Sequence, residues 1–252
     1  MAFFITNRKG RTMKSIHFGI SSGKHGQAAG HLAYITRQGC HADRNDLILT
    51  GFGNMPAWAK DDPSKLWKAS DKYEQKNGSI FRSFRVSLPN VLTIAQLEEL
   101  AWKQATRIAG NKPFQFALHM HASSLEGELN PHIHVVVCDR LPDGIERPAE
   151  QMFSRYNSTH PEKGGCPKDS GGRTAIELRG QVITQRKEAV ETNNEALEDY
   201  GHDIRFDHRT LRERGIDRKP ERYLGPARIR GMSARERSED IEQKRGKPKA
   251  FE

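Results

Sequence analysis

Two short segments in the middle of the chain alternate apolar side chains with small or polar ones. They span residues 114–121 and 130–137. Because successive side chains of a strand point to opposite faces, this alternation predicts two β-strands, each with one apolar face. A polar connection over 122–130 would let the two strands pair. We therefore expect one sheet face to gather the imidazoles of both strands: His119, His121, His132 and His134.

The rest of the hydrophobic pattern predicts a mixed fold. Thr93 and Gln96 have the spacing of a helix capping box, and Gly110 follows the last apolar turn. Comparable signals predict helices over 28–38, 62–76, 93–109 and 175–200, and further strands over 14–21, 81–88 and 203–208. This order indicates an α+β fold: a central antiparallel sheet with helices on one face and an open, histidine-bearing face.

Composition divides the chain into three parts. Residues 1–12 are interpreted as an N-terminal leader, and 13–226 as one domain. Within this domain, 141–172 is rich in Gly, Pro, Lys and Ser, which predicts a long loop. Residues 227–252 are charged and poor in apolar groups, so we expect a disordered tail.

The charge balance indicates a polyanionic partner. Lys and Arg outnumber Asp and Glu by 41 to 32, a net charge of +9, and nucleic acid is the usual partner of such a protein. The three cysteines are widely spaced and form no Cys-x-x-Cys motif, which favours a reducing, cytoplasmic location. No apolar run approaches the roughly 18 residues of a membrane span.

The histidine pattern has two interpretations. The imidazoles could be surface residues of a half-solvated sheet, or they could bind a metal ion. Their place on the matching faces of consecutive strands favours the metal. Nitrogen ligands suit manganese or zinc better than magnesium, which prefers oxygen. Three protein ligands also leave coordination positions open, as a catalytic ion needs.

Tyr34 is the best candidate for a nucleophile. Carboxylates near the histidines are few, which argues against a two-metal nuclease and leaves one metal with a side-chain nucleophile. Tyr34 follows a small, flexible Gly-rich stretch, and His31 and Arg37 lie one helical turn before and after it. The alternative is that Tyr34 packs with its apolar neighbours Leu32 and Ile35.

A series of local motifs occurs in one order between residues 13 and 226. The segments are 30–39 (GHLAYITRQG), 130–134 (NPHIH), 143–148 (DGIERP), 155–157 (RYN), 161–165 (PEKGG) and 207–226, with DHRTL, GI and LGP. Together they resemble the MobA/MobL family, plasmid-mobilisation relaxases of the HUH endonuclease class. The strand over 81–88 departs from some relatives, because Ser83 and Arg85 stand where those carry glutamate.

The resemblance implies a fold, a reaction and a set of site residues. The fold would be that of an HUH relaxase, and the enzyme would nick one DNA strand at a plasmid origin of transfer through a 5′-phosphotyrosyl intermediate that it can religate. It implies Tyr34 as nucleophile and His119, His132 and His134 as metal ligands, with His121 as the alternative to His119. The basic residues that we expect at the DNA are Arg37, Arg85, Lys163 and Arg209.

The resemblance also implies a cofactor and partners. The cofactor would be a divalent metal, manganese or magnesium first, with zinc as an alternative. The partners would be single-stranded DNA at the transfer origin, accessory mobilisation proteins, and a coupling protein or secretion apparatus.

Other functions fit parts of the pattern. A replication initiator of the same class would share the histidines, but such proteins usually place the tyrosine after them, whereas Tyr34 comes before. A non-enzymatic basic binding module with a structural metal is less consistent with histidine ligands and no cysteine. A zinc hydrolase lacks an obvious base.

Overall fold

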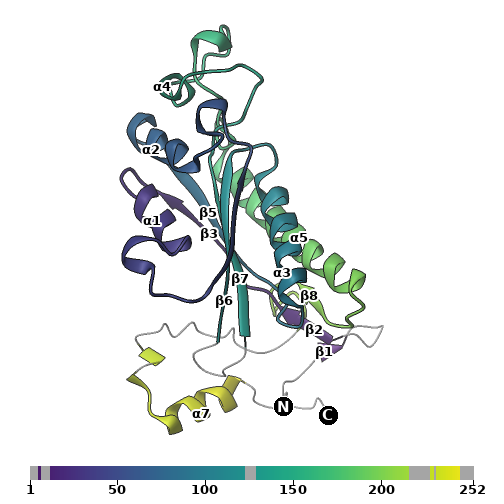
Figure 1. The fold of residues 1–252 in the computed structure, drawn as a ribbon. Coiled ribbons are helices and arrows are strands. Elements are labelled where there is room, and N and C mark those ends of the chain that lie inside the picture. Colours follow the sequence, from purple (N-terminus) through teal and green to yellow (C-terminus); the bar gives the residue numbers. More distant parts are fainter. Residues whose placement is uncertain (1–4, 7–11, 123–128, 216–227, 230, 245–252) are drawn as a thin grey trace.

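The computed structural model describes residues 5–6, 12–122, 129–215, 228–229 and 231–244. Its centre is a five-stranded sheet in which every neighbouring pair is antiparallel (Figure 1). The strand order is β3 (Phe18–Gly23), β5 (Phe81–Ser87), β7 (Leu129–Val137), β6 (Phe114–Ala122) and β4 (Leu47–Gly53). This confirms the predicted α+β fold and the pairing of the two histidine strands.

A second, smaller sheet lies beside the first. Its strands are β1 (Ile5–Thr6), β2 (Thr12–Ser15) and β8 (Arg205–Asp207). The strand predicted over 14–21 is therefore divided between the two sheets, since residues 16 and 17 separate β2 from β3. The predicted leader, residues 1–12, includes β1 and the first residue of β2, and these two strands pair in the smaller sheet. The other residues of the predicted leader lie outside the described residues.

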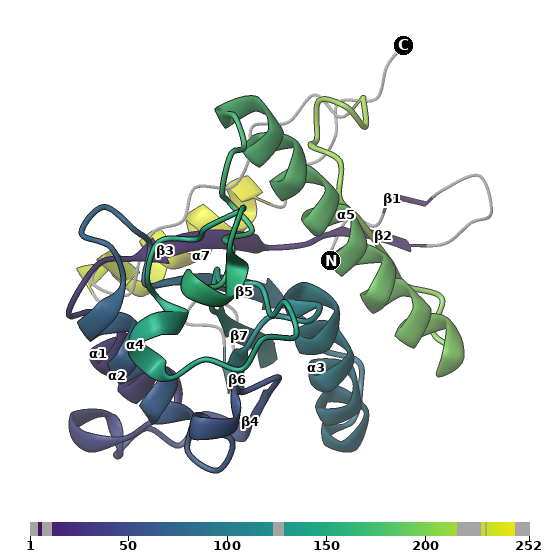
Figure 2. The same ribbon diagram turned by 90° about the horizontal axis from the view of Figure 1, so that it is seen from above.

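One face of the large sheet is covered by two long helices. These are α3 (Ile94–Ala109) and α5 (Ala175–Asp199), which lie side by side in both ribbon views (Figures 1 and 2). Large apolar side chains of the three central strands fill this interface: Phe84, Val86, Phe116, Leu118, Ile133 and Val135. The capping box that was predicted for α3 is present, with Gly110 directly after its last residue.

The opposite, histidine-bearing face is also covered in part, by α1 (Ala28–Ile35) and α2 (Pro63–Tyr73) (Figure 1). The prediction that helices cover one face and leave the histidine face open is wrong in this detail. The reason is that the same face carries Ala117 and Val136, which form a second apolar cluster with α1 and α2. This cluster holds α1 against the sheet next to the histidines.

Three further elements differ from the sequence predictions. Strand β4 occupies a segment for which the sequence predicted no strand. The long loop over 141–172 contains the short helices α4 (Ala149–Met152) and η3 (Pro161–Lys163). Arg147 stabilises this loop: its guanidinium donates to the carboxylate of Asp143 and to the carbonyls of Pro161 and Gly164. In the tail predicted to be disordered, Ala234–Lys244 forms helix α7.

Among the described residues, no helix is both long enough and apolar enough to cross a membrane. The short 3-10 helices η1 (Gly39–His41) and η2 (Ala57–Ala59) connect α1, β4 and α2 along the chain.

Candidate functional site

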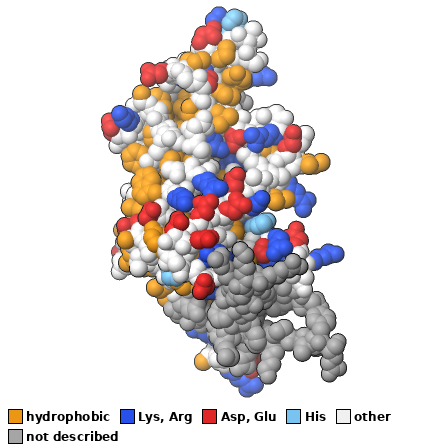
Figure 3. All heavy atoms as spheres, turned by 90° about the vertical axis from the view of Figure 1, so that its right-hand side faces the viewer, with side chains coloured by type: hydrophobic (Ala, Val, Ile, Leu, Met, Phe, Trp, Pro, Cys, Tyr) orange, Lys and Arg blue, Asp and Glu red, His pale blue; other side chains and the backbone are white. Residues whose placement is uncertain are grey.

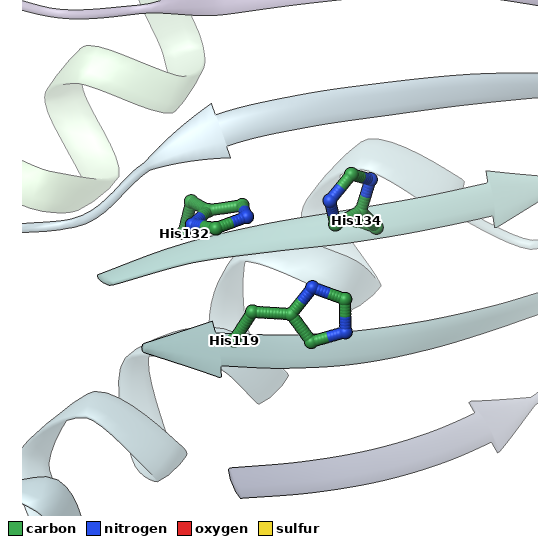
Figure 4. Close-up of side chains that lie close together, drawn as sticks. All are labelled: His119, His132 and His134. Atoms are coloured by element: carbon green, nitrogen blue, oxygen red, sulfur yellow. The ribbon is translucent and has the colours of Figure 1, made fainter. Parts of the chain in front are cut away.

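Three histidines from the two central strands meet on one face of the sheet. His119 of β6 pairs directly with His132 of β7, and His134 stands two residues further along β7. The ring centroids lie 5.0–5.5 Å apart, and one ring nitrogen of each residue falls within 4.8 Å of the other two (Figure 4). All three side chains are buried. We call this set the histidine cluster.

Burial keeps the histidine cluster uncharged. It lowers the pKa of His119, and it lowers the pKa of His132 to about 4 and that of His134 to about 2. Each imidazole therefore keeps one unprotonated ring nitrogen at neutral pH, and that of His119 accepts from Arg37 in this structure. Neutral imidazole is the form that binds a metal ion, so this donor set fits one.

Hydrogen bonds orient two of the three rings. His132 Nδ1 donates to the carbonyl of Asn130 at 3.0 Å, which leaves Nε2 as the acceptor. His119 Nε2 donates to the carbonyl of Ile35 at 2.6 Å, and its Nδ1 accepts from Arg37 Nη2 at 3.2 Å. Backbone carbonyls that fix the tautomer of a histidine are typical of metal sites.

His121 lies outside the histidine cluster. It is exposed near the end of β6, where its Nδ1 donates to the carbonyl of Ala122, although its ring is 5.2 Å from that of His132. Sequence alternation places His119 and His121 on the same face, and the packing of α1 distinguishes them by burying His119 alone.

Tyr34 borders the histidine cluster. It lies on α1, half-buried, with its ring edge-on to His134 at 6.2 Å and to His41 at 5.4 Å between centroids. The apolar side of α1, with Leu32 and Ile35 buried against the sheet, sets this position. Tyr34 thus packs against the apolar cluster that contains Leu32 and Ile35, and its ring also lies beside the histidine cluster.

Arg37 is buried and does not fit its predicted role at the DNA. Its side chain is 4% exposed, and its guanidinium donates to both carboxylate oxygens of Asp46, to the carbonyl of Tyr34 and to His119. The bond from Arg37 lowers the pKa of Asp46 to about 2. Since nearly all donors of Arg37 have partners inside the protein, the prediction that it contacts DNA is corrected to a structural role beside Tyr34.

Three polar residues of this site were not singled out from the sequence. They are His41, Arg44 and Asp46, and they belong to the segment between α1 and β4, for which the sequence predicted no helix or strand. Arg44 lies over the Tyr34 ring, 5.4 Å from its centroid. No periodicity marks them, and their spacing after Tyr34 was the only available signal.

His31, which was noted in the sequence for its spacing, also reaches the sheet. Its Nε2 lies 2.9 Å from Ser83 Oγ, and its ring stacks on Phe81 at 4.8 Å between centroids. Burial lowers its pKa. This contact ties α1 to β5 one helical turn before Tyr34.

The other basic residues predicted at the DNA occupy three different places. Arg85 is exposed on β5 and pairs with His134 in the sheet. Lys163 is exposed in η3, in the segment that follows the far end of β7. Arg209 follows β8 and forms an ion pair with Asp207 at 2.7 Å. Of these three, Arg85 alone stands on a strand beside the histidine cluster.

Comparison of the sequence with protein families identifies the family of the chain. The family model described as "MobA/MobL family" matches residues 31–235, which is most of the chain. The chain therefore belongs to the MobA/MobL family, as its motifs predicted.

Two curated relatives illustrate the relationship. Mobilization protein A of Escherichia coli is 39% identical over 194 residues, which are 77% of this chain and 26% of that protein. The 43 kDa relaxation protein of Salmonella typhimurium is 34% identical over 210 residues, which are 82% of this chain and 57% of that protein. The chain thus spans about a quarter and somewhat over half of these relatives.

A solved structure shares the fold. The structure described as "Molecular Basis of Vancomycin Resistance Transfer in Staphylococcus aureus" superposes with a TM-score of 0.53 at 20% sequence identity, covering 78% of this chain and 100% of that one.

Proposed function

We propose that this chain is a DNA relaxase that nicks one strand at a plasmid origin of transfer, with Tyr34 as nucleophile. The observation that carries the proposal is the Tyr34 ring lying edge-on to His134 of the three-histidine cluster. The names of the relatives, a mobilization protein and a relaxation protein, support it. The substrate is the single strand at the transfer origin.

His119, His132 and His134 would hold a divalent metal ion, for which their neutral nitrogens are suitable donors. When bound, such an ion neutralises charge on the scissile phosphate and on the transition state. The three nitrogen donors favour manganese, with zinc as the alternative, over magnesium.

The residues around Tyr34 account for the chemistry. Tyr34 Oη attacks phosphorus and the bond to the 3′ oxygen breaks, so the strand ends as a 5′-phosphotyrosyl ester and a free 3′-hydroxyl, which takes up the proton lost by the phenol. The central guanidinium carbon of Arg37 lies 4.7 Å from the ring centroid, so Arg37 restricts the position of the ring. Because the ester is exchanged and not hydrolysed, the same residues can reseal the strand.

The proposed relaxase function implies further partners. Accessory mobilisation proteins and a coupling protein or secretion apparatus would act with the relaxase, which would work in the cytoplasm on plasmid DNA. The net charge of +9 is consistent with a polyanionic partner.

Formation of a covalent protein–DNA adduct tests the proposal. Labelled single-stranded oligonucleotides that tile the DNA flanking the gene are incubated with the protein and Mn²⁺, and adducts are resolved on a denaturing gel. Tyr34→Phe should abolish the adduct and leave DNA affinity within a few-fold, because the ring stays in place and one hydroxyl is lost. The matched control is Tyr156→Phe, since Tyr156 is 42% exposed and follows α4. An adduct that persists in Tyr34→Phe, or is lost in the control, contradicts the assignment.

A further inference from the structure

Two guanidinium groups lie over the same tyrosine ring. The central carbon of Arg37 is 4.7 Å from the centroid of Tyr34, and that of Arg44 is 5.4 Å from it. Cations at such distances are attracted by the negative faces of aromatic rings. A reactive tyrosine therefore has two positive charges beside it, and their surroundings differ.

The two arginines differ in burial and in partners. Arg37 is enclosed, and Asp46 offsets its charge with two hydrogen bonds of 2.6 and 2.7 Å. Arg44 is exposed, and within the part of the chain that the structure describes its guanidinium forms no ion pair. Arg37 is thus neutralised inside the protein, whereas the charge of Arg44 faces solvent.

The backbone holds the segment of Arg44 at both ends. Arg44 N donates to the carbonyl of His41 at 3.2 Å, which continues the turn of η1. Two residues later, the carbonyl of Asp46 accepts from Met120 N at 2.7 Å, next to His119, and its carboxylate binds Arg37. The segment therefore joins the helix of Tyr34 to the strand of His119, and it keeps the Arg44 guanidinium near the ring.

We propose that Arg44 is a substrate-binding residue, which contacts the phosphate attacked by Tyr34 or the adjacent phosphate of the single strand. This inference rests on the proposed relaxase function. An exposed guanidinium offers a planar pair of donors that matches two phosphate oxygens, and an arginine without a carboxylate partner keeps its charge for the ligand. Arg37 positions the ring, and Arg44 binds the strand.

Methylphosphonate scanning tests the contact without relying on catalysis. The nick position is first mapped with the wild-type protein, and binding is then measured by fluorescence anisotropy in the Tyr34→Phe background with a chelator present. Arg44→Ala should weaken binding of the mapped oligonucleotide about tenfold, as loss of one charge-assisted hydrogen bond does. It should also reduce the slope of log affinity against log salt by about 0.7, the value for one contact on a single strand.

The position of the contact gives the sharper result. A single neutral methylphosphonate at the attacked phosphate or its neighbour should weaken binding when Arg44 is present and have little effect in Arg44→Ala. Arg44→Lys should restore part of the affinity, because it keeps the charge and loses the paired donors. The control is Lys103→Ala, which removes one positive charge from α3 on the opposite face of the sheet; it should bind like its parent.

The outcomes separate the two proposals. If the wild-type protein forms no adduct with any oligonucleotide, the relaxase function fails and the inference fails with it. If the adduct forms but Arg44→Ala binds like Lys103→Ala, or keeps the methylphosphonate sensitivity of its parent, the role of Arg44 is wrong and the relaxase function stands.

Discussion

The two faces of strand β6 show how one segment serves packing and chemistry at once. On one side Phe114, Phe116 and Leu118 are buried beneath α3 and α5. On the other side Ala117 packs against α1, and His119 follows it into the histidine cluster. We call these the packing face and the histidine face of the sheet. The comparison shows that small apolar residues on the histidine face let α1 approach closely enough to place Tyr34 beside the imidazoles.

The outer surfaces above the two faces also differ. On the side of α3 and α5, Lys and Arg alternate with Asp and Glu in Figure 3, and pairs such as Lys103–Glu195 offset each other. On the histidine face, Arg44 and Arg85 are exposed. Within the described part of the chain these two guanidinium groups form no ion pair, so we expect the strand of DNA at the histidine face.

The largest effect is expected from the histidine cluster itself. Replacing His119, His132 or His134 with Ala should each lower adduct formation by at least about 100-fold, because removing a ligand costs more than removing a residue that supports one. His121→Ala, the matched control from the same strand face, should stay within a few-fold. Isothermal titration with Mn²⁺ should show the same ranking in metal affinity. Equal losses at His119 and His121 would mean that both act as ligands and that burial does not distinguish them.

A change on the packing face should affect stability and spare the reaction. Phe116 is fully buried and contacts Trp102 of α3 at 4.7 Å between ring centroids. Phe116→Ala should cost about 3–5 kcal/mol of unfolding free energy, measured by urea denaturation. The adduct yield per folded molecule, assayed well below the unfolding temperature, should change little. A loss of adduct yield comparable to that of the histidine variants would show that the two faces are not independent.

The buried ion pair behind Tyr34 links stability to the reaction. Asp46→Asn leaves Arg37 buried without its carboxylate, and removal of one partner from a buried pair costs about 3 kcal/mol. The pKa of Asp46 is about 2 in the folded protein and about 3.8 in the unfolded chain. The ion pair therefore contributes its full stability above pH 3.8, and this contribution is lost as the pH falls from 3.8 toward 2. The deficit, measured by urea denaturation, should therefore be constant between pH 7 and pH 5.

Asp43→Asn is the matched control for this experiment, since Asp43 is exposed in the same segment. It should leave the unfolding free energy within about 0.5 kcal/mol of the wild-type value. A deficit for Asp46→Asn no larger than that of the control would show that Arg37 finds another partner.

Local signals in the sequence were sufficient for much of the fold and failed where tertiary contacts decide. The capping box of α3 and the alternation in β6 and β7 predicted those elements closely. Strand β4 was missed because its glycines interrupt the pattern of a strand. Gly51 is required by packing, since a Cβ there would lie 2.5 Å from the Phe116 ring.

The candidate site likewise contains residues that the sequence predicted and contacts that it could not predict. Alternation and motif resemblance singled out Tyr34 and the histidines, and the structure brings Tyr34 next to three of them. The partnership of Arg37 with Asp46 could not be predicted, because the residues between them form no regular pattern and Arg37 adopts a left-handed backbone, with φ of 55°, that turns the chain.

The smallest effects are expected from single basic residues, and their relative sizes should show where DNA lies relative to the two faces. Arg85 is exposed beside His134 on the histidine face, so Arg85→Ala should reduce the salt slope of single-strand binding by about 0.7, the value for one phosphate contact. Arg209→Ala should change the slope less, because Asp207 already offsets that charge, and Lys163→Ala less again, because η3 lies past the opposite end of β7. Anisotropy titrations of one labelled oligonucleotide over a salt series measure all three. A larger change for Lys163 than for Arg85 would place the bound strand along the segment after β7 and away from the histidine face.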